Sequence, residues 1–241
     1  LWELVDSGRA EAIVPELPAL ALEQDPIHRH KDVLSHTIAV TAKSPARLRV
    51  RLAALFHDVG KPATRKFGPG GVTFRHHEVV GSKMTRKRLR AMDYDSQTVD
   101  DVTELVRLSG RFKGYTDGWS DSAVRRYARD AGHLLGDLNA LVRSDCTPRN
   151  QAKVVALHAA IDDLEDRIKQ LAEADRRAAE RPLLDGDAVM DHLGIGPGRD
   201  VGQAVRFLLE EKRAGRTPDR DAAVARLDAW WAERQDGVSA G

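Results

Sequence analysis

A histidine–aspartate pair at the end of an apolar run is the part of the sequence best suited to chemistry. His57 and Asp58 follow the apolar segment 52–56, and Gly60, which can end a helix, and Lys61 come directly after them. A buried imidazole and carboxylate are costly unless a partner satisfies them, and a divalent metal ion would do so. A cap at the C-terminal end of a helix is the alternative that the dipeptide alone leaves open.

Three more polar residues extend this pair. His36 lies in mid-helix among apolar residues, His77 opens a basic helix, and Asp145 ends a later amphipathic helix. Each alone is more often structural, but together they offer the mixed nitrogen and oxygen ligands of a hard or borderline divalent ion. The sequence thus predicts a site for Mn²⁺, Ni²⁺, Co²⁺, Mg²⁺, Fe²⁺ or Zn²⁺. The expected ligands are His36, His57, Asp58, His77 and Asp145.

The chemistry expected of such a site is attack on phosphorus. A bound divalent ion acts as a Lewis acid and lowers the pKa of a bound water. Lys61, one turn past the pair, can neutralise a phosphate oxygen, although an ordinary solvated lysine is the alternative. Asp58 and Lys61 are therefore the predicted catalytic residues.

Composition narrows the setting of this site. The 241 residues are 41% hydrophobic and only 5% aromatic, and helix-forming residues dominate, which favours an all-α fold. The net charge of +1 argues neither for nor against a polyanionic partner. A single cysteine and no visible signal peptide suggest a reducing cytoplasm. No apolar run approaches the ~20 residues that a membrane span needs.

Apolar periodicity and helix breakers predict the elements that carry these residues. The Gly-rich connection 62–76 suits a small β-hairpin, the only strand pair expected. Asp32 caps one helix, which Pro45 ends. The other expected helices span about 1–14, 46–57, 77–90, 97–108, 120–131, 134–143, 150–180, 200–214 and 219–234. Pro182 separates a domain at 1–181 from a small helical tail at 183–241, and the missing initiator Met suggests a piece of a longer chain.

Two basic helix faces are candidates for contact with an RNA backbone, with an ordinary solvated face as the alternative. Phe112 and Tyr115, on a Gly-rich loop, would either stack on a base or anchor the loop. The basic residues are Lys83, Arg86, Lys87, Arg90, Arg125, Arg126 and Arg129.

Residues His36, His57-Asp58 and Asp145 resemble the signature of the HD superfamily of metal-dependent phosphohydrolases, which has an all-α fold. The segment His77-Glu-Val-Val-Gly-Ser is similar to its further His-x-x-x-Gly-Ala element. Nearly the whole chain resembles the C-terminal half of bacterial CCA-adding enzymes (tRNA nucleotidyltransferases) of the actinobacterial type. The segments that carry this resemblance include 15–18, 28–33, 52–65, 72–84, 121–127, 143–150 and 185–204.

The resemblance implies an HD body and a tRNA-contacting tail, with tRNA or another RNA 3′ end as partner. No Gly-Gly-x-x-Arg-Asp segment is present, so CCA addition would need a nucleotidyltransferase head outside this sequence. Two histidines common in the family are replaced by Ser109 and Lys113, which implies a mononuclear or weakly metallated site rather than a two-metal one; a degenerate site is the alternative. The expected reaction is hydrolysis of a 2′,3′-cyclic phosphate or phosphomonoester at an RNA 3′ end. A non-catalytic tRNA-binding module and a stand-alone phosphohydrolase of small nucleotides are the alternatives; the oligomeric state stays open.

Overall fold

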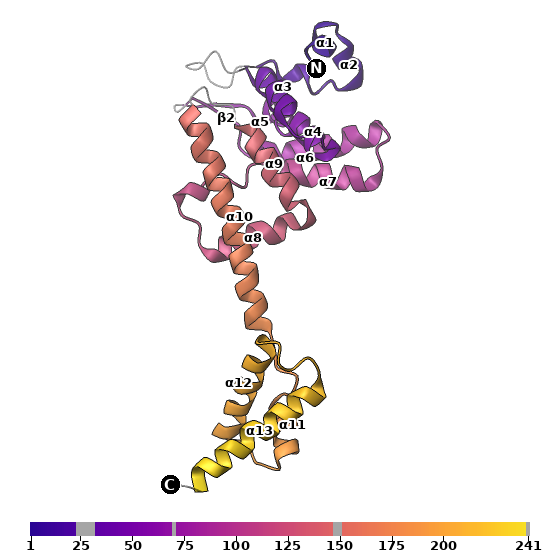
Figure 1. Cartoon of the computed structure of the whole chain (residues 1–241). Coiled ribbons are helices and arrows are strands. Elements are labelled where there is room, and N and C mark those ends of the chain that lie inside the picture. The colour runs from indigo at the N-terminus through magenta and orange to yellow at the C-terminus, as the bar shows by residue number, and fades with distance from the viewer. Residues whose placement is uncertain (23–31, 69–70, 147–150, 240–241) are drawn as a thin grey trace. The chain divides into compact units, whose positions relative to one another are not determined.

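The computed structural model describes residues 1–22, 32–68, 71–146 and 151–239, and it is mostly helical (Figure 1). The all-α prediction is therefore confirmed. The chain forms two compact units, 1–171 and 172–241. Their boundary lies inside the long helix α10 (Gln151–Ala179), whereas the predicted domain limits at 181 and 183 follow the end of that helix and stay a prediction.

The first unit is built from short and medium helices around one hydrophobic core. Its helices before the hairpin are α1 (Trp2–Asp6), α2 (Arg9–Ile13), η1 (Pro18–Leu20), α3 (Val33–Lys43), α4 (Leu48–Phe56) and α5 (Lys61–Thr64). Those after it are α6 (His77–Ala91), α7 (Ser96–Leu108), η2 (Tyr115–Asp117), α8 (Asp121–Ala131), η3 (Gly132–Leu134), α9 (Leu135–Asp145) and the first part of α10.

The N-terminal region differs from the single helix predicted over 1–14. Gly8 adopts a left-handed backbone with φ of 75°, which interrupts the helix and leaves the separate helices α1 and α2. The predicted cap of α3 is confirmed, since the Asp32 side chain accepts a hydrogen bond from the backbone N–H of Ser35 at 3.0 Å. Residues 23–31, which include His28 and His30, lie outside the described residues.

The predicted β-hairpin is present between α5 and α6. Strands β1 (Lys66–Gly68) and β2 (Gly71–Thr73) pair antiparallel, with Phe67 opposite Val72. They are the two strands that the described part of the chain contains. The hairpin is joined to α5 by one residue and to α6 by three.

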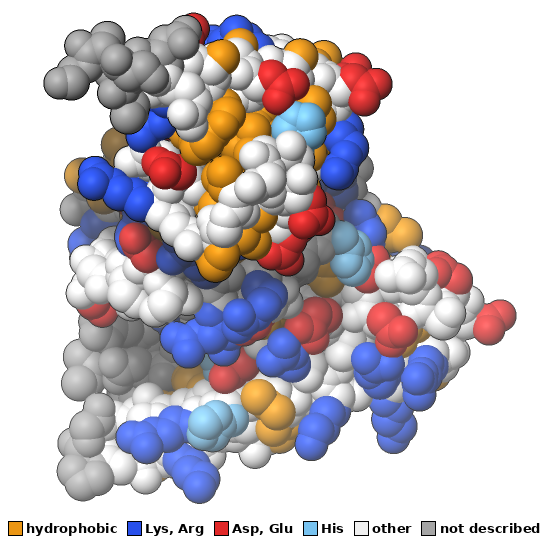
Figure 2. Space-filling model, turned by 90° about the horizontal axis from the view of Figure 1, so that it is seen from below, with side chains coloured by type: hydrophobic (Ala, Val, Ile, Leu, Met, Phe, Trp, Pro, Cys, Tyr) orange, Lys and Arg blue, Asp and Glu red, His pale blue; other side chains and the backbone are white. Residues whose placement is uncertain are grey.

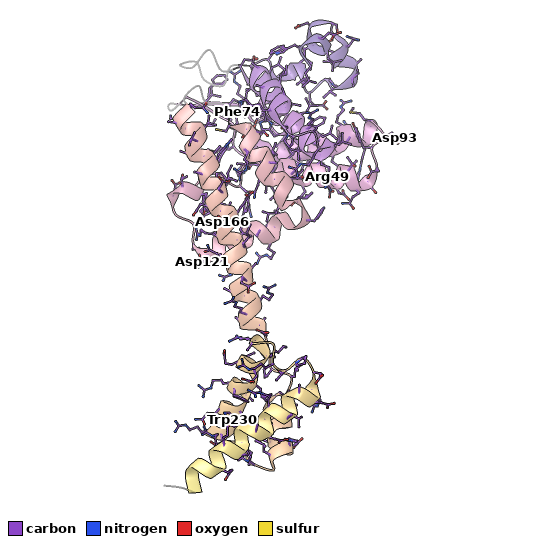
Figure 3. All side chains as sticks on the ribbon, viewed as in Figure 1. Arg49, Phe74, Asp93, Asp121, Asp166 and Trp230 are labelled. Atoms are coloured by element: carbon purple, nitrogen blue, oxygen red, sulfur yellow. The ribbon has the colours of Figure 1, made fainter. Side chains whose placement is uncertain are left out.

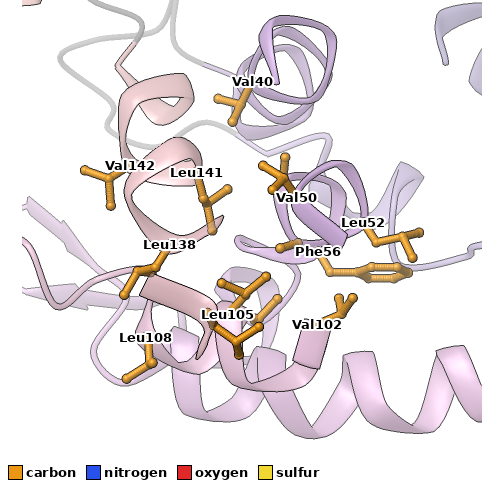
Figure 4. Packing of buried hydrophobic residues seen from close by; sticks show 14 of the residues in the cluster. Val40, Val50, Leu52, Phe56, Val102, Leu105, Leu108, Leu138, Leu141 and Val142 are labelled. Atoms are coloured by element: carbon orange, nitrogen blue, oxygen red, sulfur yellow. The ribbon is translucent and has the colours of Figure 1, made fainter. Parts of the chain in front are cut away.

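The core of the first unit lies where α3, α4, α7 and α9 meet (Figure 4). Val50 and Phe56 of α4 are fully buried, as are Leu105 of α7 and Leu138 of α9. Helix α4 thus passes through the centre of the core, and its ends are held by three neighbouring helices. Helix α10 contributes to the same core, because Ile161 and Leu164 are also fully buried in it.

The second unit has its own small core, formed by three helices and by Leu183 and Leu184, which precede them. The helices are α11 (Gly186–Leu193), α12 (Arg199–Arg213) and α13 (Arg220–Ser239). Trp230 stacks on Phe207 with ring centroids 5.5 Å apart, beside the buried Leu208 and Leu227. Across the described residues of both units, no helix has the length and apolarity to span a membrane.

Candidate metal centre

The C-terminal end of α4 leads directly into the His-Asp pair, and both side chains are buried. The Nδ1 atom of His57 lies 2.7 Å from the backbone oxygen of Ala54. Because a carbonyl oxygen can only accept, Nδ1 carries a proton, so in the neutral ring Nε2 is the nitrogen that presents a lone pair. That Nε2 atom is buried and has no hydrogen-bond partner in the described part of the chain. A buried imidazole nitrogen in this state is prepared to bind a metal ion.

The Asp58 carboxylate is the centre of the cluster. Its Oδ2 atom accepts a hydrogen bond from Lys61 Nζ at 2.7 Å and lies 3.3 Å from His57 Nε2. Its Oδ1 atom lies 3.6 Å from His77 Nε2. The predicted catalytic residues Asp58 and Lys61 are thus in direct contact, at the point where the turn after α4 enters α5.

Helices α3 and α9 bring the remaining predicted ligands. His36, on α3, has its Nε2 atom 2.8 Å from Asp145 Oδ1 and 3.9 Å from Asp58 Oδ2. The same Asp145 oxygen, at the end of α9, lies 3.6 Å from His57 Nε2. The five residues predicted as ligands therefore meet in one place. Ligand atoms of His36, His57 and Asp58 all lie within 4.8 Å of one another.

A strained turn aims His77 at this cluster. His76 caps α6 in a left-handed conformation with φ of 62°, which is uncommon for a residue with a side chain. In the same turn, His77 Nδ1 donates to the Phe74 carbonyl at 2.8 Å, which leaves Nε2 facing Asp58. His57 and His77 therefore share one arrangement, in which a backbone carbonyl fixes the tautomer that a metal ligand needs.

Gly60 allows α6 to approach the cluster closely. A Cβ atom at this position would lie 2.0 Å from the His77 carbonyl oxygen and 2.7 Å from the backbone nitrogen of Gly81. The expected role of Gly60 was to end the helix, but its φ of −79° is an ordinary value. Its missing side chain is what matters, because any larger residue would push His77 away from Asp58.

Electrostatics in the cluster favour a bound cation. Burial alone would lower the pKa of His57, but the charges of Asp58 and Asp145 outweigh it and raise that pKa to about 10. Burial opposes ionisation of both carboxylates, yet His57 and Lys61 hold the pKa of Asp58 well below its usual range, and His36 and His57 do the same for Asp145. Burial lowers the pKa of His77, which keeps its ring neutral.

A divalent ion fits this donor set. Because the raised pKa keeps a proton on His57 in the metal-free chain, a bound ion would have to displace it. Two ionised carboxylates and one ammonium then leave one negative charge among neutral imidazoles, and an ion of charge +2 would reverse its sign toward a phosphate. The orphaned Nε2 of His57 would gain the partner it lacks. His36, His57, Asp58 and Asp145 would hold the ion with His77 beside them, an oxygen and nitrogen set that suits first-row metals.

The predicted RNA-contacting residues occupy two helices. On α6, Lys83, Lys87 and Arg90 are exposed, while Arg86 pairs with Asp100 at 2.5 Å. On the face drawn in Figure 2, basic and acidic side chains are interspersed. The assignment of these residues to RNA stays a prediction.

On α8, Arg125, Arg126 and Arg129 are exposed, and Arg129 lies 3.8 Å from Asp130. Arg126 lines a cavity of about 420 Å³ together with Arg111, Trp119, Ala123 and Tyr127. Of the two roles weighed for the neighbouring aromatic residues, loop anchoring matches the structure. Phe112 and Tyr115 are buried and stack on each other at 5.5 Å.

Cys146 follows Asp145, one of the predicted ligands, directly. Its backbone oxygen accepts a hydrogen bond from Lys43 of α3 at 3.4 Å, which ties the end of α9 to α3. Partial burial raises the pKa of its thiol, so the group is protonated at neutral pH.

Comparison with known proteins identifies the class of protein first. The model of the family described as HD domain matches residues 33–229, and the chain therefore belongs to that family. Two curated relatives then narrow the relationship. The chain is 33% identical over 96% of its length to the CC-adding tRNA nucleotidyltransferase of Thermus thermophilus. It is 30% identical over 92% of its length to the A-adding tRNA nucleotidyltransferase of Deinococcus radiodurans.

The chain spans about half the length of these relatives, 52% of each. The predicted resemblance to the C-terminal half of tRNA nucleotidyltransferases is confirmed. What the relatives' names describe is nucleotide addition to tRNA by proteins about twice as long as this chain.

Proposed function

We propose that this chain is the metal-dependent phosphohydrolase portion of a tRNA nucleotidyltransferase-like protein. Its reaction would be hydrolysis of a phosphoester at an RNA 3′ end, either a 2′,3′-cyclic phosphate or a phosphomonoester. The observation that carries the proposal is the convergence of three imidazole Nε2 atoms on Asp58 and Asp145, with that of His57 buried and unpartnered. Membership of the HD domain family agrees with this reading.

The residues of the chain would each have a defined task. Bound to them, a divalent ion supplies Lewis acidity at phosphorus and a water of lowered pKa. The carbonyls of Ala54 and Phe74 keep His57 and His77 in the tautomer that presents Nε2. Lys61 donates one N–H to Asp58 and keeps two more for a phosphate oxygen, which would stabilise the charge that develops there.

The partner proposed for this site is tRNA or another RNA 3′ end, in the cytoplasm. Two observations support it: the relationship to tRNA nucleotidyltransferases and the exposed cations Lys83, Lys87 and Arg90 on one face of α6. Because the chain covers about half of those relatives, a nucleotidyltransferase head belonging to the same protein would supply any CCA addition.

The decisive experiment measures metal and turnover in the same preparation. The purified chain should hold close to one equivalent of metal after incubation with Mn²⁺, Ni²⁺ or Co²⁺ and removal of the excess. It should then hydrolyse nucleoside 2′,3′-cyclic phosphates or the 3′-phosphate of an RNA. The variant Asp58→Asn should do neither. A wild-type chain that holds no stoichiometric metal and cleaves none of these substrates would contradict the proposal.

A non-catalytic module that binds tRNA for a separate head is the second candidate function. The half-length match to tRNA nucleotidyltransferases favours it independently of the metal centre. In that case, tRNA would bind with an affinity that falls steeply with salt, and removal of the metal would leave this affinity unchanged.

A further inference from the structure

The β-hairpin follows the candidate metal centre directly in the sequence. Helix α5, which begins at Lys61, is followed by β1 after a single residue, and Phe74 follows β2. The Phe74 carbonyl orients His77, and its ring lies 5.6 Å from the Lys61 ammonium. Phe74 therefore joins the base of the hairpin to the lysine that contacts Asp58; its position beside the strands is marked in Figure 3.

One face of the hairpin carries an exposed aromatic ring. Phe67 is 71% exposed, the highest value among the large hydrophobic residues that the structure describes. It lies opposite Val72 in the strand register, so these two side chains share a face. The guanidinium of Arg65 lies 4.8 Å from the centroid of the Phe67 ring. We call Arg65, Phe67 and Val72 the hairpin face.

An exposed ring that a guanidinium contacts is suited to stacking. Every nucleobase offers a π-face, and base stacking on an aromatic side chain tolerates any base. Arg65 follows α5, which begins at Lys61, and adds a second positive charge to this segment, which favours an anionic ligand. The patch is too small for a stable protein interface, since each partner in such an interface buries about 800 Å².

We propose that the hairpin face stacks the nucleobase of a substrate whose phosphate lies at the metal centre. The inference rests on the proposed function and narrows it to phosphoesters that carry a base. Phe67 is then a binding residue that sets specificity. Simple phosphate esters without a base would reach the same metal centre without its help.

A comparison of two substrates tests this role. Kinetics are measured for adenosine 2′,3′-cyclic phosphate and for glycerol 1,2-cyclic phosphate, which has no base. In Phe67→Ala, KM for the nucleotide should rise about 10-fold. Its kcat should stay within about twofold, and the glycerol ester should be cleaved as by the wild type, because stacking acts on binding alone. Phe67→Trp should restore the wild-type KM.

The matched control is Val155→Ala, which shortens another exposed apolar residue of the same unit. It should leave both substrates unaffected. An unchanged KM for the nucleotide in Phe67→Ala, or an equal loss for both substrates, would overturn the role given to the hairpin.

A binding measurement separates this inference from the proposed hydrolysis. Calorimetry on the metal-loaded chain compares adenosine 3′-phosphate with inorganic phosphate. The wild type should bind the nucleotide more tightly, and Phe67→Ala should lose about 10-fold of that affinity. Base-dependent binding without turnover would contradict only the hydrolysis. Turnover with equal affinity for the two ligands, or with affinity that Phe67→Ala does not change, would contradict only the hairpin inference.

Discussion

Helix α4 has a buried polar cluster at each end, and the two clusters differ in how completely their atoms are paired. At the N-terminal end, Arg49 donates to one oxygen of Asp101 at 2.7 Å. The other oxygen of Asp101 lies 2.7 Å from Gln97 Nε2 and 2.9 Å from His133 Nε2. At the C-terminal end, Nε2 of His57 is buried without a hydrogen-bond partner among the described residues. The first cluster is closed, whereas the second needs one more component. Figure 3 shows Arg49 well apart from Phe74, which lies beside the second cluster.

The difference shows how a structural cluster can be told from a functional one. Both clusters contain buried acids with lowered pKa values, so burial and pKa shifts alone do not separate them. A closed network offsets the desolvation of its charges with groups of the protein itself and so belongs to the fold. An open one keeps part of that penalty until a ligand binds, and is therefore a candidate functional site.

The largest expected effect removes the acid of the open cluster. Asp58→Asn keeps the shape of the side chain but takes away the charge that holds a cation. We expect stoichiometric metal binding to be lost and hydrolysis to fall by at least ~100-fold, with the helical content unchanged. Metal analysis by mass spectrometry and circular dichroism on the same sample check both points. Full metal content in this variant would show that the ligand set is wrong.

A mutation in the closed cluster around Asp101 should lower stability and leave metal binding unchanged. Asp101→Ala leaves Arg49 and His133 without their buried acceptor, and we expect the free energy of unfolding to fall by about 2 kcal/mol. Metal content per folded molecule should not change. Urea denaturation gives the first quantity and metal analysis of the folded fraction the second. The neighbouring, exposed Asp100 provides the control, since Asp100→Ala should cost less than about 1 kcal/mol. Equal losses in the two variants would remove the distinction between the clusters.

Gly60 tests whether the open cluster depends on backbone approach. In Gly60→Ala, the new Cβ would meet the His77 carbonyl, so we expect a loss of about 1–3 kcal/mol in stability together with weaker metal binding. Gly136, in α9, has open space around its Cα and serves as the control. Gly136→Ala should be neutral or stabilise by up to about 1 kcal/mol. Thermal denaturation and metal titration measure the two effects; wild-type metal affinity in Gly60→Ala would refute the argument.

The smallest effect concerns a second closed cluster, in the tail unit. Glu211 is buried there and accepts hydrogen bonds from Arg216 at 2.6 Å and Arg226 at 2.5 Å, which lower its pKa to about 2. Because the folded pKa lies below the unfolded one, this group stabilises above about pH 4.5, and the contribution disappears as the pH falls toward 2.

Glu211→Gln should therefore destabilise the tail by about 1 kcal/mol at neutral pH and flatten its loss of stability in acid. Hydrogen exchange of α12 and α13 between pH 5 and pH 3 measures this. Glu210→Gln alters an adjacent exposed side chain, which pairs with Arg213 at 3.0 Å, and should leave the acid response as in the wild type. A steep acid response that persists in Glu211→Gln would rule out this origin.

Most elements of the fold were predictable because local sequence patterns mark them, although the division of residues 1–14 into two helices was not. Apolar spacing marks α7 and α10, and the Gly-Pro-Gly-Gly stretch marks the hairpin. The candidate ligands His57 and Asp58 could be found because an adjacent imidazole and carboxylate after a buried helix need a partner. The resemblance to HD proteins linked this pair to His36 and Asp145, which are distant in the sequence.

Pairings between distant segments could not be predicted from one sequence. Nothing in the sequence near Arg49 shows that it reaches Asp101 on another helix, 52 positions away. The contact between Gly60 and the His77 backbone could not be predicted either, because glycine has no side chain whose chemistry would indicate a partner. The left-handed His76 is a further case, since only the assembled turn imposes that conformation.

Cys146 offers a single position for site-specific labelling. The sequence contains one cysteine, and it adjoins the candidate ligand Asp145. A fluorophore or spin label can therefore be attached at one defined point without removing any other thiol. Because the thiol is protonated at neutral pH, labelling is slow and its rate is sensitive to small changes in local exposure. The rate of alkylation would thus follow events at the end of α9 in real time, in the unmodified protein.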